Sequence, residues 1–186
     1  MRRTLLQAER LKALLMGALI ALVAGAALGY VAFAGGLVPT NADAKPSHLE
    51  RYLASMSLRK TVQRESRGLR NPLSADLVNL NAGLELYGQN CAVCHGTADG
   101  KASKIALGLY QRPPQLAEKG VEDDPVSVTF WKVKHGIRLT GMPSFSRTLS
   151  DTQLWQIAIF LKQMDNLPRP VGMAWKRLHL AASASR

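Results

Sequence analysis

The sequence predicts an all-α protein in which a membrane-spanning helix and a connector helix precede a small helical domain. One long segment near the N-terminus is apolar and uncharged. Several later segments place apolar residues at helical spacing, and no segment alternates apolar and polar residues as a strand would. The 186 residues allow one compact domain of about 100 residues plus appendages.

The apolar N-terminal segment, residues 13–38, predicts a transmembrane anchor. It consists mainly of Leu, Ala, Val, Ile and Gly and exceeds the roughly 20 residues that a bilayer-crossing helix needs. Residues 1–12 are basic, because Arg2, Arg3, Arg10 and Lys12 are offset by Glu9 alone. The positive-inside tendency therefore places residues 1–12 in the cytoplasm. We expect a single-pass protein of the cytoplasmic (inner) membrane, with its later domain facing the periplasm or the cell exterior.

A cleavable signal peptide is the alternative to a retained anchor. Ala42-Asp43-Ala44 is a small-x-small site after Pro39, so cleavage before Lys45 is conceivable. The apolar stretch is longer than the roughly 7–15 residues of a usual signal-peptide core, which favours an uncleaved, signal-like anchor. Either outcome exports the rest of the chain.

Residues 45–75 are expected to form a helical connector. Ser47 and Glu50 have the spacing of a capping box. Apolar residues then recur at helical intervals at Leu49, Tyr52, Leu53 and Met56. Other positions are basic, namely Arg51, Arg59, Lys60, Arg64 and Arg67, which predicts a basic face away from the apolar stripe. Such a helix would lie on anionic headgroups, pack on a partner subunit, or act as a solvated spacer.

Residues 76–168 are expected to form the helical domain, and residues 169–186 a basic C-terminal tail. Short helices are predicted for residues 81–87 and 126–136. A second capping box at Ser150 and Gln153 begins a helix that ends near Asp165. The intervening segment 96–114 is rich in Gly and Pro and is expected to be loop with one short turn at most.

The net charge of +11 comes from the flanks of the chain. Residues 79–168 hold nine basic and eight acidic residues, whereas residues 1–78 hold eleven against five and residues 169–186 hold four against none. A nucleic-acid-binding domain would carry the excess itself. The distribution therefore predicts no nucleic-acid partner.

Both cysteines of the chain fall within one motif, Cys91-Ala92-Val93-Cys94-His95. This spacing is typical of a c-type haem attachment site, in which each thiol adds to one vinyl group of the porphyrin and the histidine reaches the iron. A redox dithiol, half of a zinc site and a disulfide share the CxxC pattern. No second CxxC or spaced histidine pair is present, and the flanks are helical. The motif therefore predicts one covalent haem c with its iron.

A haem iron that transfers electrons needs a second axial ligand, and Met142 is the best candidate. Gly141 and Pro143 place it in a loop that can approach the ring without a helix in the way. A thioether ligand also raises the reduction potential. Met164 falls in a predicted helix and is expected in the core, and Met173 lies in the tail.

Five motifs follow one another between about residues 79 and 167. They are Gly83-x-x-Leu86-Tyr87-x-x-x-Cys91-Ala92-Val93-Cys94-His95-Gly96, Arg112-Pro113-Pro114-Gln115-Leu116, Phe130-Trp131-x-x-x-His135-Gly136-Ile137, Gly141-Met142-Pro143-Ser144-Phe145 and Leu149-Ser150-Asp151. Together they resemble the small, single-haem bacterial cytochromes c (class I). The resemblance implies the small cytochrome c fold, with three to five short helices around a covalent haem.

The resemblance also implies the roles of individual residues. Cys91 and Cys94 would hold the haem, with His95 and Met142 as axial ligands of its iron. The carbonyl of Pro114 would accept a hydrogen bond from the His95 ring, which would fix the tautomer.

Three further expectations follow from the resemblance. Trp131 would face a haem propionate, with an ordinary core tryptophan as the alternative. His135 would be structural, because the Lys-His-Gly context recurs in the family without touching iron. Gly83 and Tyr87 would pack against Ile157 and Phe160 where the terminal helices cross.

The expected function is that of a membrane-tethered single-electron carrier, which needs no catalytic acid, base or nucleophile. Its partners would be redox proteins, such as a membrane oxidase, a quinol-oxidising complex or a dehydrogenase, and membrane lipid would contact the N-terminal helix. One alternative is the cytochrome c subunit of a membrane oxidoreductase of the nitric-oxide reductase, terminal oxidase or dehydrogenase type. Another is a gas-binding or peroxidatic haem protein with an open distal site, against which Met142 argues.

Overall fold

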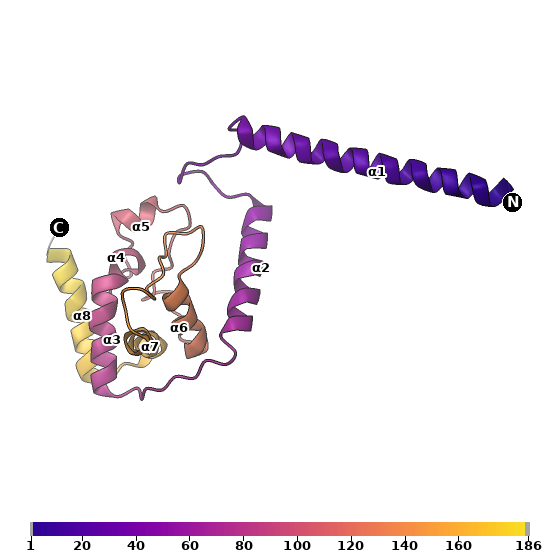
Figure 1. Ribbon diagram of the computed structural model, residues 1–186. Helices are drawn as coiled ribbons and strands as arrows, with labels where there is room; N and C mark the ends of the chain where they lie inside the picture. Colours follow the sequence, from indigo (N-terminus) through magenta and orange to yellow (C-terminus); the bar gives the residue numbers. More distant parts are fainter. Residues whose placement is uncertain (1, 185–186) are drawn as a thin grey trace. The chain divides into compact units, whose positions relative to one another are not determined.

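The structure is a computed structural model that describes residues 2–184, and it confirms the predicted all-α class. Within this range the regular elements are eight α-helices and one 3₁₀ turn, with no strand (Figure 1). The chain divides into two compact units, Met1–Asn41 and Ala42–Arg186.

The first unit is built on α1 (Arg2–Ala34). Within it, Glu9–Ala34 is apolar and long enough to cross a membrane, with a mean hydropathy of 2.2. It is the single helix of the described residues that meets this test of length and composition. The helix predicted over residues 13–38 is therefore present and ends at Ala34, shortly before Pro39.

The core of the second unit lies where α3 (Leu77–Asn90) crosses α7 (Asp151–Lys162). A Cβ atom added at Gly83 would lie 2.7 Å from Cβ of Phe160, so the two helices meet at a distance that only glycine allows. The Tyr87 and Phe160 rings contact each other with centroids 5.6 Å apart. The packing implied for Gly83 and Tyr87 is thus confirmed.

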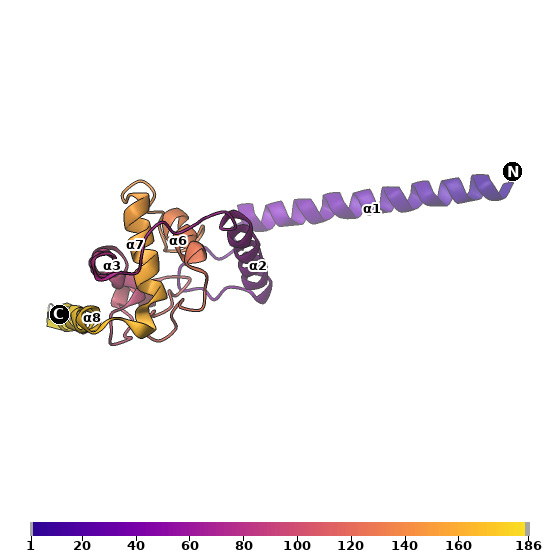
Figure 2. The ribbon, with the colours of Figure 1, turned by 90° about the horizontal axis from the view of Figure 1, so that it is seen from below.

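A C-terminal helix, α8 (Arg169–Ala184), lies alongside α3, as Figures 1 and 2 both show. It follows a 3₁₀ turn over Met164–Asn166, in which Met164 is buried as expected. Val171 and Trp175 are buried, and the Trp175 ring contacts Tyr87 edge-on with centroids 5.4 Å apart. Residues 169–178 therefore take part in the domain's core packing and do not form a separate tail.

The connector contains α2 (His48–Glu65), which packs against α6 (Val126–His135). Ser47 caps α2 by accepting the Glu50 N–H, as predicted. The other half of the predicted capping box is absent, because Glu50 Oε1 instead accepts the Tyr110 O–H at 2.5 Å. The connector is therefore held at both ends of α2, since Val62 near its C-terminus is buried.

The segment expected to be mostly loop contains α5 (Lys104–Gly108), which follows the short α4 (Ala92–His95). Ser103 caps α5 by accepting the Ala106 N–H, and its hydroxyl donates to the Val93 carbonyl at 2.5 Å. This pair of bonds ties α5 to α4, which carries the cysteine motif.

Candidate functional site

One cavity brings together the residues that the sequence singled out as a site. It is a partly enclosed cavity that opens to the surface. Its lining includes Cys91, Cys94, His95, Pro114 and Met142. These residues come from the turn between α3 and α4, from α4 and from two separate loops, so the fold assembles the site from segments far apart in sequence.

The turn from α3 into α4 positions the cysteine motif. Cys91 N–H donates to the Tyr87 carbonyl at the end of α3, and His95 N–H donates to the Cys91 carbonyl at 2.9 Å. Gly96 ends α4 with φ +78°, a conformation that L side chains rarely adopt. The buried Tyr87 hydroxyl donates to the Gly96 carbonyl at 2.8 Å. The motif is therefore anchored at both ends to α3.

A hydrogen bond fixes the orientation of the His95 ring. Nδ1 lies 3.0 Å from the Pro114 carbonyl oxygen, and because a carbonyl only accepts, Nδ1 must carry the proton. Burial lowers the pKa of His95, against the opposing effect of the Pro114 bond. The ring is therefore neutral, with Nε2 free to act as an electron-pair donor.

Cys91 lies in a setting that does not suit a redox dithiol. Burial, with a smaller contribution from Cys94, raises the pKa of Cys91 to about 12. A nucleophilic CxxC cysteine has a lowered pKa. The two thiols are not joined in a disulfide. Within residues 2–184, no group of three or more His, Cys, Asp or Glu side chains is arranged to hold a metal ion, so the zinc interpretation finds no ligand set there.

The loop that carries Met142 is tied to the end of α6. Met142 N–H donates to the Thr140 hydroxyl at 3.1 Å, and the Met142 carbonyl accepts the Ile137 N–H at 3.2 Å. Gly136 turns the chain with φ +67°, and a Cβ added there would lie 2.6 Å from the Pro143 carbonyl oxygen. The loop is thus compact, and only glycine fits at position 136, where the loop begins.

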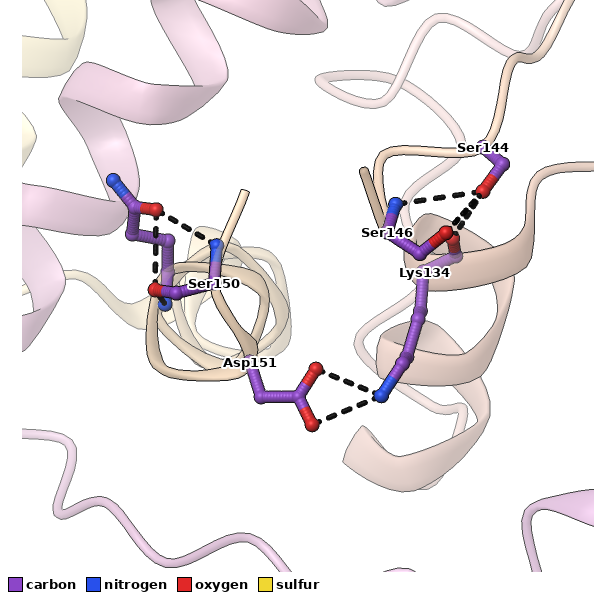
Figure 3. A network of polar contacts seen from close by, with 6 residues as sticks. Lys134, Ser144, Ser146, Ser150 and Asp151 are labelled. Atoms are coloured by element: carbon purple, nitrogen blue, oxygen red, sulfur yellow. Dashed lines mark hydrogen bonds and ion pairs between the residues drawn. The ribbon is translucent and has the colours of Figure 1, made fainter. Parts of the chain in front are cut away.

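A polar network beyond Met142 connects this loop to both α6 and α7 (Figure 3). The Lys134 carbonyl accepts the Ser144 hydroxyl at 2.8 Å and the Ser146 N–H at 3.1 Å. The Lys134 ammonium forms an ion pair with Asp151, at 2.7 Å from Oδ1. Ser150 and Gln153 cap α7 reciprocally, which confirms the predicted capping box. Both ends of the segment that follows Met142 are therefore held in place.

Trp131 lies away from the cavity. It is buried in α6, its indole N–H donates to Glu65 of α2 at 3.2 Å, and it is not among the lining residues. The indole N–H is engaged by the connector helix, and the propionate contact of Trp131 stays a prediction. The alternative interpretation, a core tryptophan, fits. His135 also lies outside the lining, with its ring centroid 4.9 Å from that of Trp131.

The cavity suits a flat, apolar group with an anionic edge. Most of its lining is apolar, including Leu109, Val133 and Phe145. Among the lining residues, Arg112 is the one with a permanent charge, and it is exposed. A haem has an apolar macrocycle and two propionates, so the donor set, the walls and the charge at the rim all fit it.

The comparison with protein families adds an independent observation. A family model for cytochrome c oxidase, cbb3-type, subunit III matches residues 78–161. These residues form a c-type cytochrome domain. The domain carries a covalently bound haem c with its iron. The match spans α3 to α7, so α1, α2 and α8 lie outside it. Neither the curated proteins nor the solved structures contain a significant match.

Several features of the cytochrome domain's site were missed by the sequence reasoning. Leu109 and Val133 line the cavity from α5's end and from α6, and no motif marks them. Arg112 was noted within a motif but given no role. An arginine in a Pro-rich loop of a near-neutral domain could have marked it, because arginine pairs readily with carboxylates.

Proposed function

We propose that the protein is a membrane-tethered single-electron carrier with a His/Met-ligated haem c on the periplasmic side. Cys91 and Cys94 would supply the covalent bonds, and His95 and Met142 would be the axial ligands. The bound iron accepts and releases one electron at a time. The observation that carries this proposal is that a fixed His95 Nε2 and the Met142 loop line the same cavity as the two cysteines.

Each residue has one task in this proposal. Pro114 keeps the proton on Nδ1 of His95, so that Nε2 would be the nitrogen available to ligate the iron. The Met142 thioether favours the ferrous state and raises the potential. The guanidinium of Arg112 would balance a propionate charge. The apolar walls exclude water and hold the ring by packing.

The tether would be α1, with its basic N-terminal residues in the cytoplasm. Support comes from its length, its hydropathy of 2.2 and the charge asymmetry of its flanks. A tether confines the domain near membrane partners and raises its effective concentration there. The partners would be quinol-oxidising complexes, dehydrogenases or terminal oxidases.

A second candidate function is favoured by the family match. The chain would then be a fixed cytochrome c subunit of a terminal oxidase, since the matched model describes a subunit of a cbb3-type oxidase. Electron transfer would be the same, but the partner would be permanent.

Purification of the full, tagged chain from detergent-solubilised membranes distinguishes these functions. A free carrier should elute without other chains. Its haem should stay attached during denaturing electrophoresis, and the chain should stay in the membrane fraction after an alkaline carbonate wash. Stoichiometric co-purification of other oxidase chains would favour the fixed subunit. Haem that is lost on denaturation, or a chain released by carbonate, would contradict the tethered cytochrome.

A further inference from the structure

The apolar stripe of α2 points away from the cytochrome domain. Because helical positions advance by about 100° per residue, Leu49, Tyr52, Leu53 and Met56 project on one side and Leu58 and Val62 on the other. Val62 is buried and Leu58 half-buried against the domain. The four stripe residues are exposed, with 66% of Leu49 and 62% of Tyr52 accessible. The stripe therefore has no partner within the described residues.

Basic residues continue the same side of α2 toward its C-terminus. Arg59 and Lys60 are exposed and fall, by the same helical geometry, on the side of the stripe. This corrects the expectation of a basic face opposite the stripe. We call Leu49, Tyr52, Leu53, Met56, Arg59 and Lys60 the outward face of α2.

Both acidic residues of α2 are engaged elsewhere. Glu50 accepts the Tyr110 O–H, and Glu65 accepts the Trp131 N–H and pairs with Arg64 at 2.8 Å. Neither carboxylate belongs to the outward face, which therefore carries no acidic side chain. The outward face thus combines apolar and basic groups, while Arg51 projects on the opposite side of the helix.

We propose that the outward face of α2 lies on a membrane surface that contains anionic lipid. The inference rests on the proposed tether. Leu49, Leu53 and Met56 would enter the boundary between headgroups and acyl chains, where Tyr52 also has a preferred environment. Arg59 and Lys60 would reach anionic headgroups, and this attraction is screened by salt.

The chain's connectivity supports lipid as the occupant. Only residues 35–47 separate α1 from α2, a link of at most about 45 Å when fully extended. If α1 spans the bilayer, α2 begins close to its surface. Because α2 is fixed to Trp131 and Tyr110, its contact with lipid would set the orientation of the haem domain above the membrane.

Spin labels on α2 of the full-length holoprotein test this placement. Leu53→Cys puts a label on the outward face, and Ala54→Cys is the matched control, since Ala54 is exposed on the neighbouring side. The haem thioethers leave the introduced cysteine as the single free thiol, and the ferrous low-spin haem does not broaden the signal. Collisions with oxygen and with a nickel chelate are measured in vesicles of phosphatidylcholine alone and with one-quarter phosphatidylglycerol.

We expect the label at position 53 to collide severalfold more often with oxygen and severalfold less often with the nickel chelate than the label at position 54. This difference should be larger in vesicles that contain phosphatidylglycerol. Equal values at both positions would overturn it. Exclusion of both agents at position 53 would also overturn it, because protein would then cover the face. Equal values in the two lipids, or insensitivity to Arg59→Gln with Lys60→Gln, would refute the anionic preference.

An alkaline carbonate wash of the same vesicles separates this inference from the proposed tether. Release of the chain would show that the tether itself fails. If the vesicles retain the chain but the label at position 53 is exposed to water, the contact between α2 and lipid is refuted and the tether is not.

Discussion

The Nδ1 atom of His95 donates to the Pro114 carbonyl at 3.0 Å, which leaves Nε2 as the unprotonated ring nitrogen. Leu116 N–H donates to the His95 carbonyl at 3.1 Å, so the backbone after Pro114 is tied to the same residue. Gln115 Nε2 donates to the Cys94 carbonyl at 3.2 Å. The Pro-rich loop is therefore bound to the cysteine motif through three hydrogen bonds. These bonds involve protein atoms alone, so the protein itself orients the His95 ring.

Gly136→Ala should destabilise the cytochrome domain and loosen the Met142 loop. The φ of +67° costs an alanine about 1–2 kcal/mol, and its Cβ would press on Pro143. Chemical denaturation of the holoprotein checks the loss of stability. Gly172→Ala is the control, because its Cβ would meet nothing closer than 3.9 Å. Equal stability of the two variants would contradict the strained corner.

Tyr87→Phe should cost about 1–3 kcal/mol, because the Gly96 carbonyl loses its buried donor. The variant should also lose part of the protein's sensitivity to alkali. Burial raises the pKa of Tyr87 well above 10.0, so the folded state holds this proton where the unfolded state has released it. Stability linked to this group is complete below pH 10 and falls as the pH rises beyond it. Urea midpoints at pH 8 and pH 11 should differ less in Tyr87→Phe than in the wild type.

Arg112→Gln should lower the reduction potential. The guanidinium of Arg112, which lines the cavity, would stabilise a bound haem in its reduced, less positive state, so its removal would favour the ferric state. The loss of one such surface charge would correspond to a shift on the order of 20–50 mV. Redox titration measures it, with Arg147→Gln as the control, because Arg147 does not line the cavity. A potential that falls equally in the control would refute the role of Arg112.

Trp175→Ala should unfold the cytochrome domain at lower denaturant than the wild type. The side chain is 7% exposed and contacts Tyr87 and Phe160, and truncation of a buried tryptophan costs about 3–5 kcal/mol. Met173→Ala on the same helix is the control, since Met173 is 49% exposed. A neutral Trp175 variant would mean that α8 is dispensable.

The parts of the fold that were predicted from sequence are those with local signals. The CxxCH motif, the Ser150 capping box and the helix over residues 126–136 each depend on neighbours in the chain. The 126–136 helix was correct to within one residue, because Pro125 and Gly136 mark its ends.

The parts that were missed depend on partners distant in sequence. Trp175 of α8 finds its place only against α3, and the composition of residues 169–186 reads as a polar tail. No local signal marks the hydrogen bond from Trp131 to Glu65, which lies 66 residues away. The outward face of α2 could be recognised only after Val62 showed which side meets the domain.

Near-infrared absorption of the ferric holoprotein tests the central claim, axial ligation by His95 and Met142, most directly. The wild type and Met173→Ala should show the sulfur-to-iron band that a thioether ligand produces, and Met142→Ala should lack it while keeping its haem through denaturing electrophoresis. A band that survives in Met142→Ala, or that is missing from the wild type, would contradict the account.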